Sequence, residues 1–342
     1  MKKIFLAVLL PLLLLFSFCS AQATVTSSNV KGDLKISMLN IGHGDSIVIQ
    51  TKKQTILIDT GKHDEHTRFV RELEKLSVTK IDKIILTHPH VDHIGGAKML
   101  IKPTAKELAA YPYLKKISVA EVYDNGTAYT SGAYRSLMKT IKDTGIPYRS
   151  LKVNDELDFG GGVKFKVFWP TSEFVAEMNA GKSADKKDRQ YGMNNSSIVG
   201  KLTYKKFSMM FTGDCEKESE AKILKSCAAE DLKCDVLKSG HHGISTSSTK
   251  NFVAAVNPSV VLISAVGAAN IEMFKAPPHL KVIETYLSAG VDGKNIFSTH
   301  ANGTITITTN GKNFSVQPEV KAAWLDEWLT AKKDSIAKRK KG

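Results

Sequence analysis

A cluster of histidines and an aspartate, directly after an apolar strand-like run, constrains this chain most. Residues 84–96 read IILTHPHVDHIGG, so three of the ten histidines fall within six residues. Residues two apart in an extended segment point the same way, so we expect His88 and His90 to face one ion together. Asp92 and His93 follow where the chain must turn, and can face a second ion. Zinc and other borderline divalent ions select such ligands, so the cluster predicts a metal site.

The first residues have the pattern of a secretory signal peptide. Two lysines precede the apolar run 4–18, and small residues follow up to Ala23. We therefore predict that residues 1–23 are removed and that the chain is secreted. The alternative is a lipid anchor at Cys19, although the preceding Phe18 is bulkier than the small residue usual there. No later stretch is long and apolar enough to span a bilayer.

The net charge indicates which kinds of partner the chain attracts, and the number of cysteines limits the disulfides that it can form. The net charge of +14 attracts polyanions such as nucleic acid, anionic lipid headgroups or wall polymers. A basic surface without a specific partner is equally common in exported proteins. Cys215, Cys227 and Cys234 remain after removal of the signal peptide, and an odd number cannot pair wholly within the chain. A disulfide between Cys227 and Cys234 is one option.

Strand-like and helical segments alternate along the rest of the chain. We expect strands at 34–39, 46–50, 54–59, 83–86, 117–123, 163–168, 197–203, 207–212, 235–238, 260–264, 295–298, 304–308 and 313–316, and helices at 63–77, 134–142, 217–227, 249–256, 279–289 and 324–340. Two consecutive β-rich halves with interleaved helices predict an α+β fold, in which two sheets pack face to face with helices outside.

This pattern divides the chain into a signal peptide, a polar leader, one domain and a basic C-terminal helix or tail. Their bounds are residues 1–23, 24–32, 33–317 and 318–342. The polar segment 181–192 lacks periodicity and is a candidate for a mobile loop near the mouth of the site, with an inert surface loop as the alternative.

Four further motifs end strand-like runs, where α/β sheets usually present functional groups. They are Asn40–Asp45, Leu57–Gly61 with Asp59, Phe211–Asp214, and Leu237–Gly243 with its paired His241 and His242. Each motif alone is weak, because Gly-Asp after a strand is usually just a turn. Their combination with the histidine cluster is the strong signal.

Together these motifs resemble the metallo-β-lactamase superfamily over about Lys31–Val316, and most closely the exported hydrolase domain of ComEC, the bacterial DNA-uptake channel protein. The narrower match is carried by Leu39–Ser46, Asn194–Ser197, His241–Gly243 followed by Ser245–Ser248, Pro278-His279, and Ser298–Gly303. The resemblance implies the αββα sandwich, with the metals at one edge between the sheets.

The resemblance also implies a centre of two divalent ions, zinc or alternatively manganese. His88 and His90 would bind the first ion, Asp92 and His93 the second, and the Asp214 carboxylate both. The remaining implied roles are His241 as a further ligand of the second ion, with His242 as the alternative, Asp59 as the residue that orients a ligating imidazole, and Asp45 and Asn195 as supporting residues.

The chain departs from the superfamily pattern between the cluster and the bridging aspartate. The superfamily usually has another histidine there, but no histidine occurs from Ile94 to Gly240. In the ComEC-like branch the Asn-Asn-Ser segment occupies this place. The first ion would then be weakly held, rich in water, or completed by Asn195 or His279.

Two ions about 3.5–4 Å apart can share a water, lower its pKa and clamp both oxygens of a displacement, which suits phosphodiester hydrolysis. We expect Asp92 to orient the bridging hydroxide, and His241, His242 or His279 to stabilise phosphoryl oxygens or protonate the leaving group. The run 245–249 either adds hydroxyl donors to phosphate or caps the next helix.

The leading hypothesis is a secreted metal-dependent phosphodiesterase with DNA as its polyanionic substrate. The alternatives are a phosphodiesterase on small or wall-linked esters, such as phosphorylcholine on teichoic acids, and a polyanion-binding protein without activity. The sequence leaves the oligomeric state open.

Overall fold

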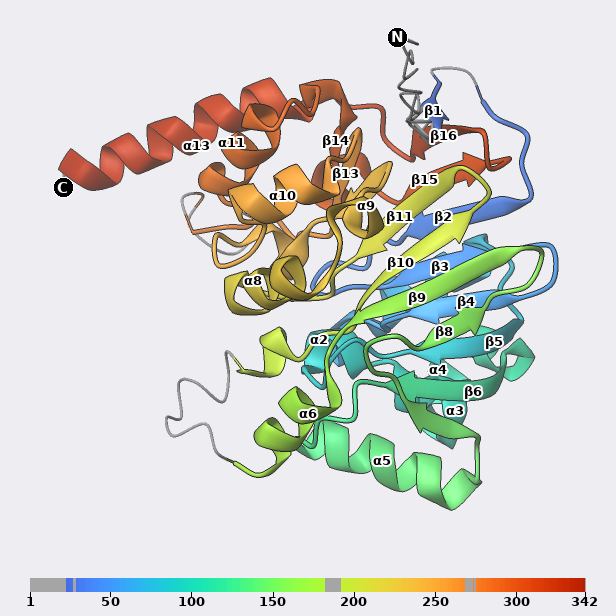
Figure 1. Cartoon of the computed structure of the whole chain (residues 1–342). Coiled ribbons are helices and arrows are strands. Elements are labelled where there is room, and N and C mark those ends of the chain that lie inside the picture. The colour runs from blue at the N-terminus through green and yellow to red at the C-terminus, as the bar shows by residue number, and fades with distance from the viewer. Residues whose placement is uncertain (1–22, 27–28, 182–191, 268–272, 274, 342) are drawn as a thin grey trace, which may run out of the picture.

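Two mixed β-sheets pack face to face in the computed structural model, which describes residues 23–26, 29–181, 192–267, 273 and 275–341 (Figure 1). The first sheet has nine strands in the order β1 (Thr24–Val25), β16 (Asn313–Pro318), β15 (Ile305–Thr309), β2 (Leu34–Met38), β3 (Ile47–Gln50), β4 (Thr55–Ile58), β5 (Lys80–Ile85), β6 (Ser118–Asp124) and β7 (Tyr148–Ser150). The second has seven, in the order β14 (Ile296–Ser298), β13 (Val260–Ile263), β12 (Val236–Lys238), β11 (Phe207–Phe211), β10 (Val199–Tyr204), β9 (Val163–Trp169) and β8 (Glu156–Asp158).

The alternation of apolar residues along the strands explains how the sheets meet. Leu34, Ile36 and Met38 of β2 enter the central core, and Phe207 and Met209 of β11 meet them from the second sheet. All five side chains are fully buried. Each such burial contributes roughly 1.5–3 kcal/mol, so the inner faces supply the main attraction between the sheets.

Helices cover both outer faces of the sandwich. On the first sheet lie α1 (His66–Lys75), α3 (Ala97–Ile101) and α5 (Gly132–Thr144); on the second lie α8 (Lys217–Ser226), α10 (Lys250–Val256), α11 (Leu280–Ser288) and α13 (Trp324–Lys341). In α1, for example, Phe69, Val70 and Leu73 occupy one buried face. The predicted αββα sandwich is confirmed.

The shorter helical segments lie in the connections. They are α2 (Val91–Ile94), α4 (Ala105–Ala110), α6 (Ser172–Asn179), α9 (Ala229–Leu232), α12 (Thr299–Asn302), η1 (His63–Glu65), η2 (Pro112–Lys116), η3 (Gly240–Gly243) and η4 (Gly293–Asn295). The sequence reading missed the edge strands β7 and β8. Both have three residues; every residue of β7 is exposed, and β8 has a single buried residue, Leu157, so neither is long enough to show a repeated apolar alternation.

Several expectations concern the chain ends and the loops. The predicted signal peptide, apart from Ala23, and residues 182–191 of the candidate loop lie outside the described residues. Thr24 and Val25 of the expected leader pair with β16. Cys215, Cys227 and Cys234 are free thiols, so the optional disulfide is not formed. In the described part of the chain, no helix is both long and apolar enough to cross a membrane.

Parallel pairing brings the functional loops to one edge. Strands β4, β5, β6 and β7 run parallel in the first sheet, and β11, β12, β13 and β14 run parallel in the second. Segments that follow parallel strands leave the sheet at the same edge. The motifs after β4, β5, β11 and β12 therefore come together where the two sheets meet.

Candidate metal centre

Four side chains from both sheets converge at this edge. Asp92, His93, Asp214 and His242 each offer one ligand atom, and these atoms lie within 4.8 Å of one another. His93 Nε2 is 3.2 Å and His242 Nε2 is 3.4 Å from Asp214 Oδ2. Asp214 thus lies between an imidazole from the first sheet and one from the second, and it is only 2% exposed.

The local backbone conformation positions the candidate ligands that follow β5 of the first sheet. His90 is the extended residue before α2, whose first turn carries Asp92 and His93. Gly44 passes so close that a Cβ there would lie 2.0 Å from the carbonyl oxygen of Asp92. The glycine is therefore required for the loop after β2 to pack against the cluster, and Asp45 N donates a hydrogen bond to the same carbonyl.

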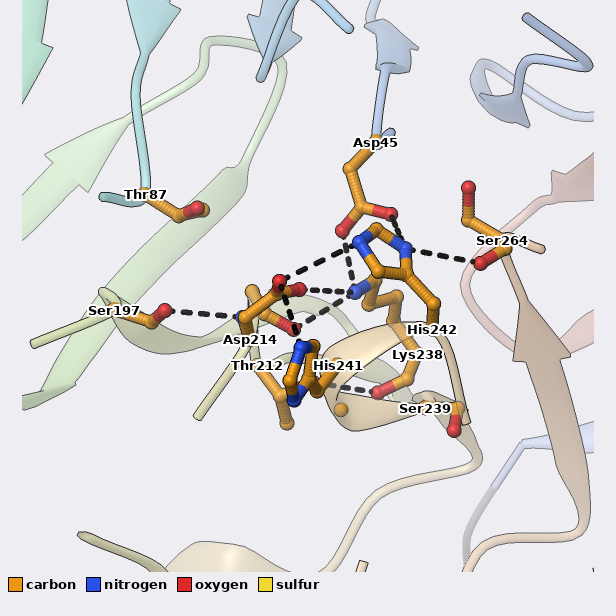
Figure 2. Close-up of polar contacts among 12 residues, drawn as sticks. Asp45, Thr87, Ser197, Thr212, Asp214, Lys238, Ser239, His241, His242 and Ser264 are labelled. Carbon is orange, nitrogen blue, oxygen red and sulfur yellow. Dashed lines mark hydrogen bonds and ion pairs between the residues drawn. The ribbon is translucent and has the colours of Figure 1, made fainter. Parts of the chain in front are cut away.

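The histidine doublet after β12 sends its two rings to different partners. His241 and His242 have φ of 45° and 54°, a left-handed conformation that costs about 1–3 kcal/mol per residue and is concentrated at functional sites. The His242 ring lies 3.3 Å from Asp45 and 3.4 Å from Asp92, and its Nδ1 donates to Ser264 O (Figure 2).

His241 lies beside this group rather than in it. Its Nδ1 is 2.9 Å from Glu216 Oε1, while its Nε2 is 3.9 Å from Asp214 Oδ2. The structure therefore places His242, the alternative of the sequence reading, in the group of four.

His88 and His90 form a second, looser arrangement. His88 Nε2 lies 3.0 Å from His90 Nδ1 and 3.9 Å from Asp214 Oδ2. His88 therefore lies farther from the carboxylate than His93 does, and His90 contacts it through His88. His90 Nε2 is buried and makes no hydrogen bond.

Asn195 and His279 were the expected substitutes for the missing histidine. Asn195 makes hydrogen bonds to residues at the start of α8. Asn195 Oδ1 accepts hydrogen bonds from the backbone N–H groups of Glu216 and Ser219, at the start of α8. The neighbouring Asn194 is the amide close to the centre, with Nδ2 at 3.4 Å from His241 Nε2 and a buried Oδ1 that makes no hydrogen bond.

His279 is also occupied elsewhere. Its Nδ1 accepts a hydrogen bond from Ser245 N, and its Nε2 contacts Lys275 O at 3.2 Å. A carbonyl can only accept, so Nε2 carries the proton. Both ring nitrogens are therefore engaged.

Asp59 supports His93 from behind. Its Oδ2 is 2.8 Å from His93 Nδ1, and its Oδ1 accepts a hydrogen bond from Thr87 N. This contact fixes the ring so that Nε2 faces Asp214. The arrangement has the geometry that the resemblance implies for Asp59.

Lys238 is a part of the centre that the sequence reading missed. It is 1% exposed, its ammonium pairs with Asp45 and donates to Gly213 O at 2.8 Å, and it lies 3.9 Å from Asp214 Oδ1 (Figure 2). The available signal was its position, because Lys238 ends a buried strand directly before the histidine doublet.

The carboxylates of the centre attract positive charge strongly. Burial opposes ionisation of Asp45, but Lys238, His242 and His93 outweigh it and hold its pKa at about 2. Burial likewise opposes protonation of His93, yet Asp214, Asp59 and Asp92 raise its pKa well above the usual value. Burial and His93 lower the pKa of His88 well below its usual value, although Asp214 acts in the opposite direction.

Comparison with known proteins identifies a domain in this chain. Residues 39–173 match the profile described as "Metallo-beta-lactamase superfamily". The chain contains a metallo-beta-lactamase domain. "ComE operon protein 3" of Bacillus subtilis is 28% identical over 304 residues, which cover 83% of this chain and 34% of that protein. "Competence protein ComA" of Neisseria gonorrhoeae is 23% identical over 259 residues, covering 75% of this chain and 30% of that protein.

The chain thus spans about a third of the length of these curated relatives. Among solved structures, the metallo-beta-lactamase fold protein YhfI of Bacillus subtilis is 12% identical with a TM-score of 0.46, and the match covers 80% of this chain and all of that one. The expected resemblance to the superfamily and to its competence-protein branch is confirmed.

The residues present fit a divalent cation, as the metallo-beta-lactamase domain implies. His93 Nε2 and His242 Nε2 are buried without a hydrogen bond, and both face Asp214 Oδ2; the other oxygen of this carboxylate, Oδ1, is also buried without a hydrogen bond. Orphaned buried polar atoms are costly unless a partner satisfies them. The carboxylates that raise the pKa of both histidines would stabilise a cation equally, and the mixture of nitrogen and oxygen donors is one that zinc accepts.

Replacing Asp59 by alanine tests its supporting role in the metallo-beta-lactamase domain. We expect the affinity for zinc to fall about 10–100-fold, because His93 loses the acceptor that orients its ring. Competition with a chromophoric chelator measures this change. Asp82→Ala is the control, since Asp82 binds Thr55 N at the far end of β4 and β5. Equal affinities of wild type and Asp59→Ala would contradict the role.

Proposed function

We propose that this chain is an exported metal-dependent phosphodiesterase that cleaves DNA. Membership in a hydrolase superfamily supports the reaction class. The observation that carries the proposal is the Asp214 carboxylate, which faces His93 and His242 from opposite sheets and has His88 beyond them. A carboxylate shared in this way suits two cations, and two cations suit the two oxygens that enter and leave in a phosphodiester displacement.

In this proposal, the exposure of each side chain of the centre indicates whether it binds metal or contacts the attacking water. When bound, divalent ions supply Lewis acidity and lower the pKa of a water. His88, His90, His93, Asp214 and His242 would hold them. Asp92 is the most exposed member of the group of four, with 17% of its side chain accessible, and its Oδ2 lies 3.4 Å from His242 Nε2 and 3.3 Å from Nε2 of the exposed His43. We assign to Asp92 the orientation of the attacking water.

In this proposal, neither His242 nor His279 transfers a proton. The ring of His242 faces two carboxylates of the centre, which suits a ligand. The hydrogen bonds of His279 use both of its ring nitrogens. His43, with half of its side chain exposed beside Asp92, is placed to contact a substrate oxygen.

The choice of DNA is supported by charge and by relatives. The chain carries a net charge of +14, which favours polyanionic substrates. One relative is named a competence protein and another, from Haemophilus influenzae, "Recombination protein 2". Hydrolysis of small or wall-linked phosphodiesters remains the second candidate, because the same centre would serve it.

Incubating purified protein with plasmid and single-stranded DNA in the presence of zinc or manganese tests the proposal. We expect cleavage that EDTA abolishes and that Asp92→Asn slows at least about 100-fold, since removing a group that orients the nucleophile costs several kcal/mol. Intact DNA together with hydrolysis of bis(p-nitrophenyl) phosphate would favour the small-ester candidate. Intact DNA and ester with metal bound would favour a polyanion-binding protein.

A further inference from the structure

A second cavity opens beside the centre, on the side of the second sheet. It has a volume of about 280 Å³, and we call it the lysine pocket; its polar lining includes Lys217, Ser245, Ser247, Thr249, Lys250 and Lys281. Building on the proposed function, we propose that the lysine pocket binds a backbone phosphate of the substrate strand next to the phosphodiester that is cleaved.

The chain connects the lysine pocket directly to the centre. Ser245 and Thr246 follow the histidine doublet by a few residues, and Thr246 Oγ1 lies 3.1 Å from His241 Nδ1. The backbone N–H of Lys217 donates to Thr246 O, which ties the start of α8 to this loop. The residues that line the pocket therefore include the first residues of α8 and α10 and residues of α11.

The lining of the lysine pocket contains three lysines and no carboxylate, and Glu220 lies behind the backbone of Ser248 and Thr249. Lys250 and Lys281 are exposed and form no ion pair with any residue that the structure describes, while Lys217 has Glu218 at 3.7 Å. Lys217 and Lys250 are the first residues of α8 and α10, and Lys281 is the second residue of α11; a positive charge in the first turn of a helix is disfavoured by about 0.3–1 kcal/mol. A bound anion would compensate both the mutual repulsion and this cost.

The hydroxyl and backbone groups of the pocket are already engaged, which identifies the lysines as the binding groups. Glu220 accepts hydrogen bonds from the backbone N–H of Ser248 and Thr249. Ser247 Oγ donates to Gly240 O, and Thr249 caps α10 by accepting from Phe252 N. The run 245–249 thus closes the loop and caps the helix, and the ammonium groups attract the phosphate.

A phosphate group of a polymer fits these features better than a small anion. The exposed ammonium groups of Lys250 and Lys281 give charge attraction rather than a shaped site, as in the contacts that position nucleic acid backbones. The same attraction acts on any sequence, so the pocket would hold the strand in place without selecting bases.

Binding of a phosphorothioate single strand of 20 nucleotides to the metal-loaded full chain tests the inference without requiring cleavage. For Lys250→Gln/Lys281→Gln, we expect the Kd to rise about tenfold and the salt dependence of log Kd to become shallower by about 1.4. Fluorescence anisotropy measures both, and the metal content confirms that the centre stays loaded.

The matched control removes two positive charges from the opposite outer face. Lys115→Gln/Lys142→Gln changes η2 and α5, which cover the first sheet. An equal rise of the Kd in both double variants, or no rise in either, overturns the inference. So does loss of binding to anionic lipid vesicles with binding of the strand retained. Weakened strand binding in a protein that fails to cleave DNA would refute only the proposed function.

Discussion

Replacing Asp214 by asparagine is expected to reduce hydrolysis of the preferred phosphodiester at least about 1,000-fold, which corresponds to about 4 kcal/mol of transition-state stabilisation. The change keeps the size of the side chain and removes the negative charge that His93 and His242 both face. We also expect the metal content of the purified protein to fall, and elemental analysis measures it independently of activity.

Asp235→Asn is the matched control for this variant. Asp235 is buried as deeply as Asp214, but it lies at the opposite end of β12, where its carboxylate accepts a hydrogen bond from Ser208 N. Metal content and activity should therefore remain close to wild type even if stability falls. Full metal content in Asp214→Asn would rule out its role as the shared ligand.

Replacing Lys238 by methionine should give the largest loss of stability. Removing one partner of a buried ion pair typically costs about 3–5 kcal/mol, because the remaining charge stays buried without compensation. Here the remaining charge is the carboxylate of Asp45, and Lys238 is also close to Asp214. Urea unfolding of the metal-free protein measures the loss, since a bound cation could replace the ammonium.

A second substitution isolates the pair. In Asp45→Asn/Lys238→Met the buried charge is removed as well, so we expect part of the stability to return, with a coupling energy of about 1–3 kcal/mol. Strict additivity of the two single losses would mean that the Lys238 ammonium and the Asp45 carboxylate act separately, and would contradict the ion pair.

The sequence predicted the layers of the fold and the segments that form the centre. Apolar alternation in runs such as Leu34–Met38 reports directly on burial, and the functional motifs end such runs at Asp59, His88 and Asp214. Parallel strands present their carboxyl ends at a common edge within each sheet, and the resemblance to the superfamily implied that the edges of the two sheets meet at the centre.

The finer details depend on backbone conformation that residue identity does not reveal. Left-handed backbone at both His241 and His242 decides which ring enters the group of four, and such conformations are uncommon for residues other than glycine. Lys238 was missed for a related reason: a lysine at the end of a strand normally extends into solvent, and only the presence of Asp45 and Asp214 keeps it inside.

The candidate ligands of the centre come from both sheets, so a bound cation would also stabilise the fold. A cation held by His93 and Asp214 together would cross-link two halves of the chain that are distant in sequence, and would restrict the unfolded ensemble as a disulfide does. Cys215, Cys227 and Cys234 form no disulfide, so a bound cation would supply the cross-link instead, and resistance to unfolding and proteolysis would follow the concentration of that ion.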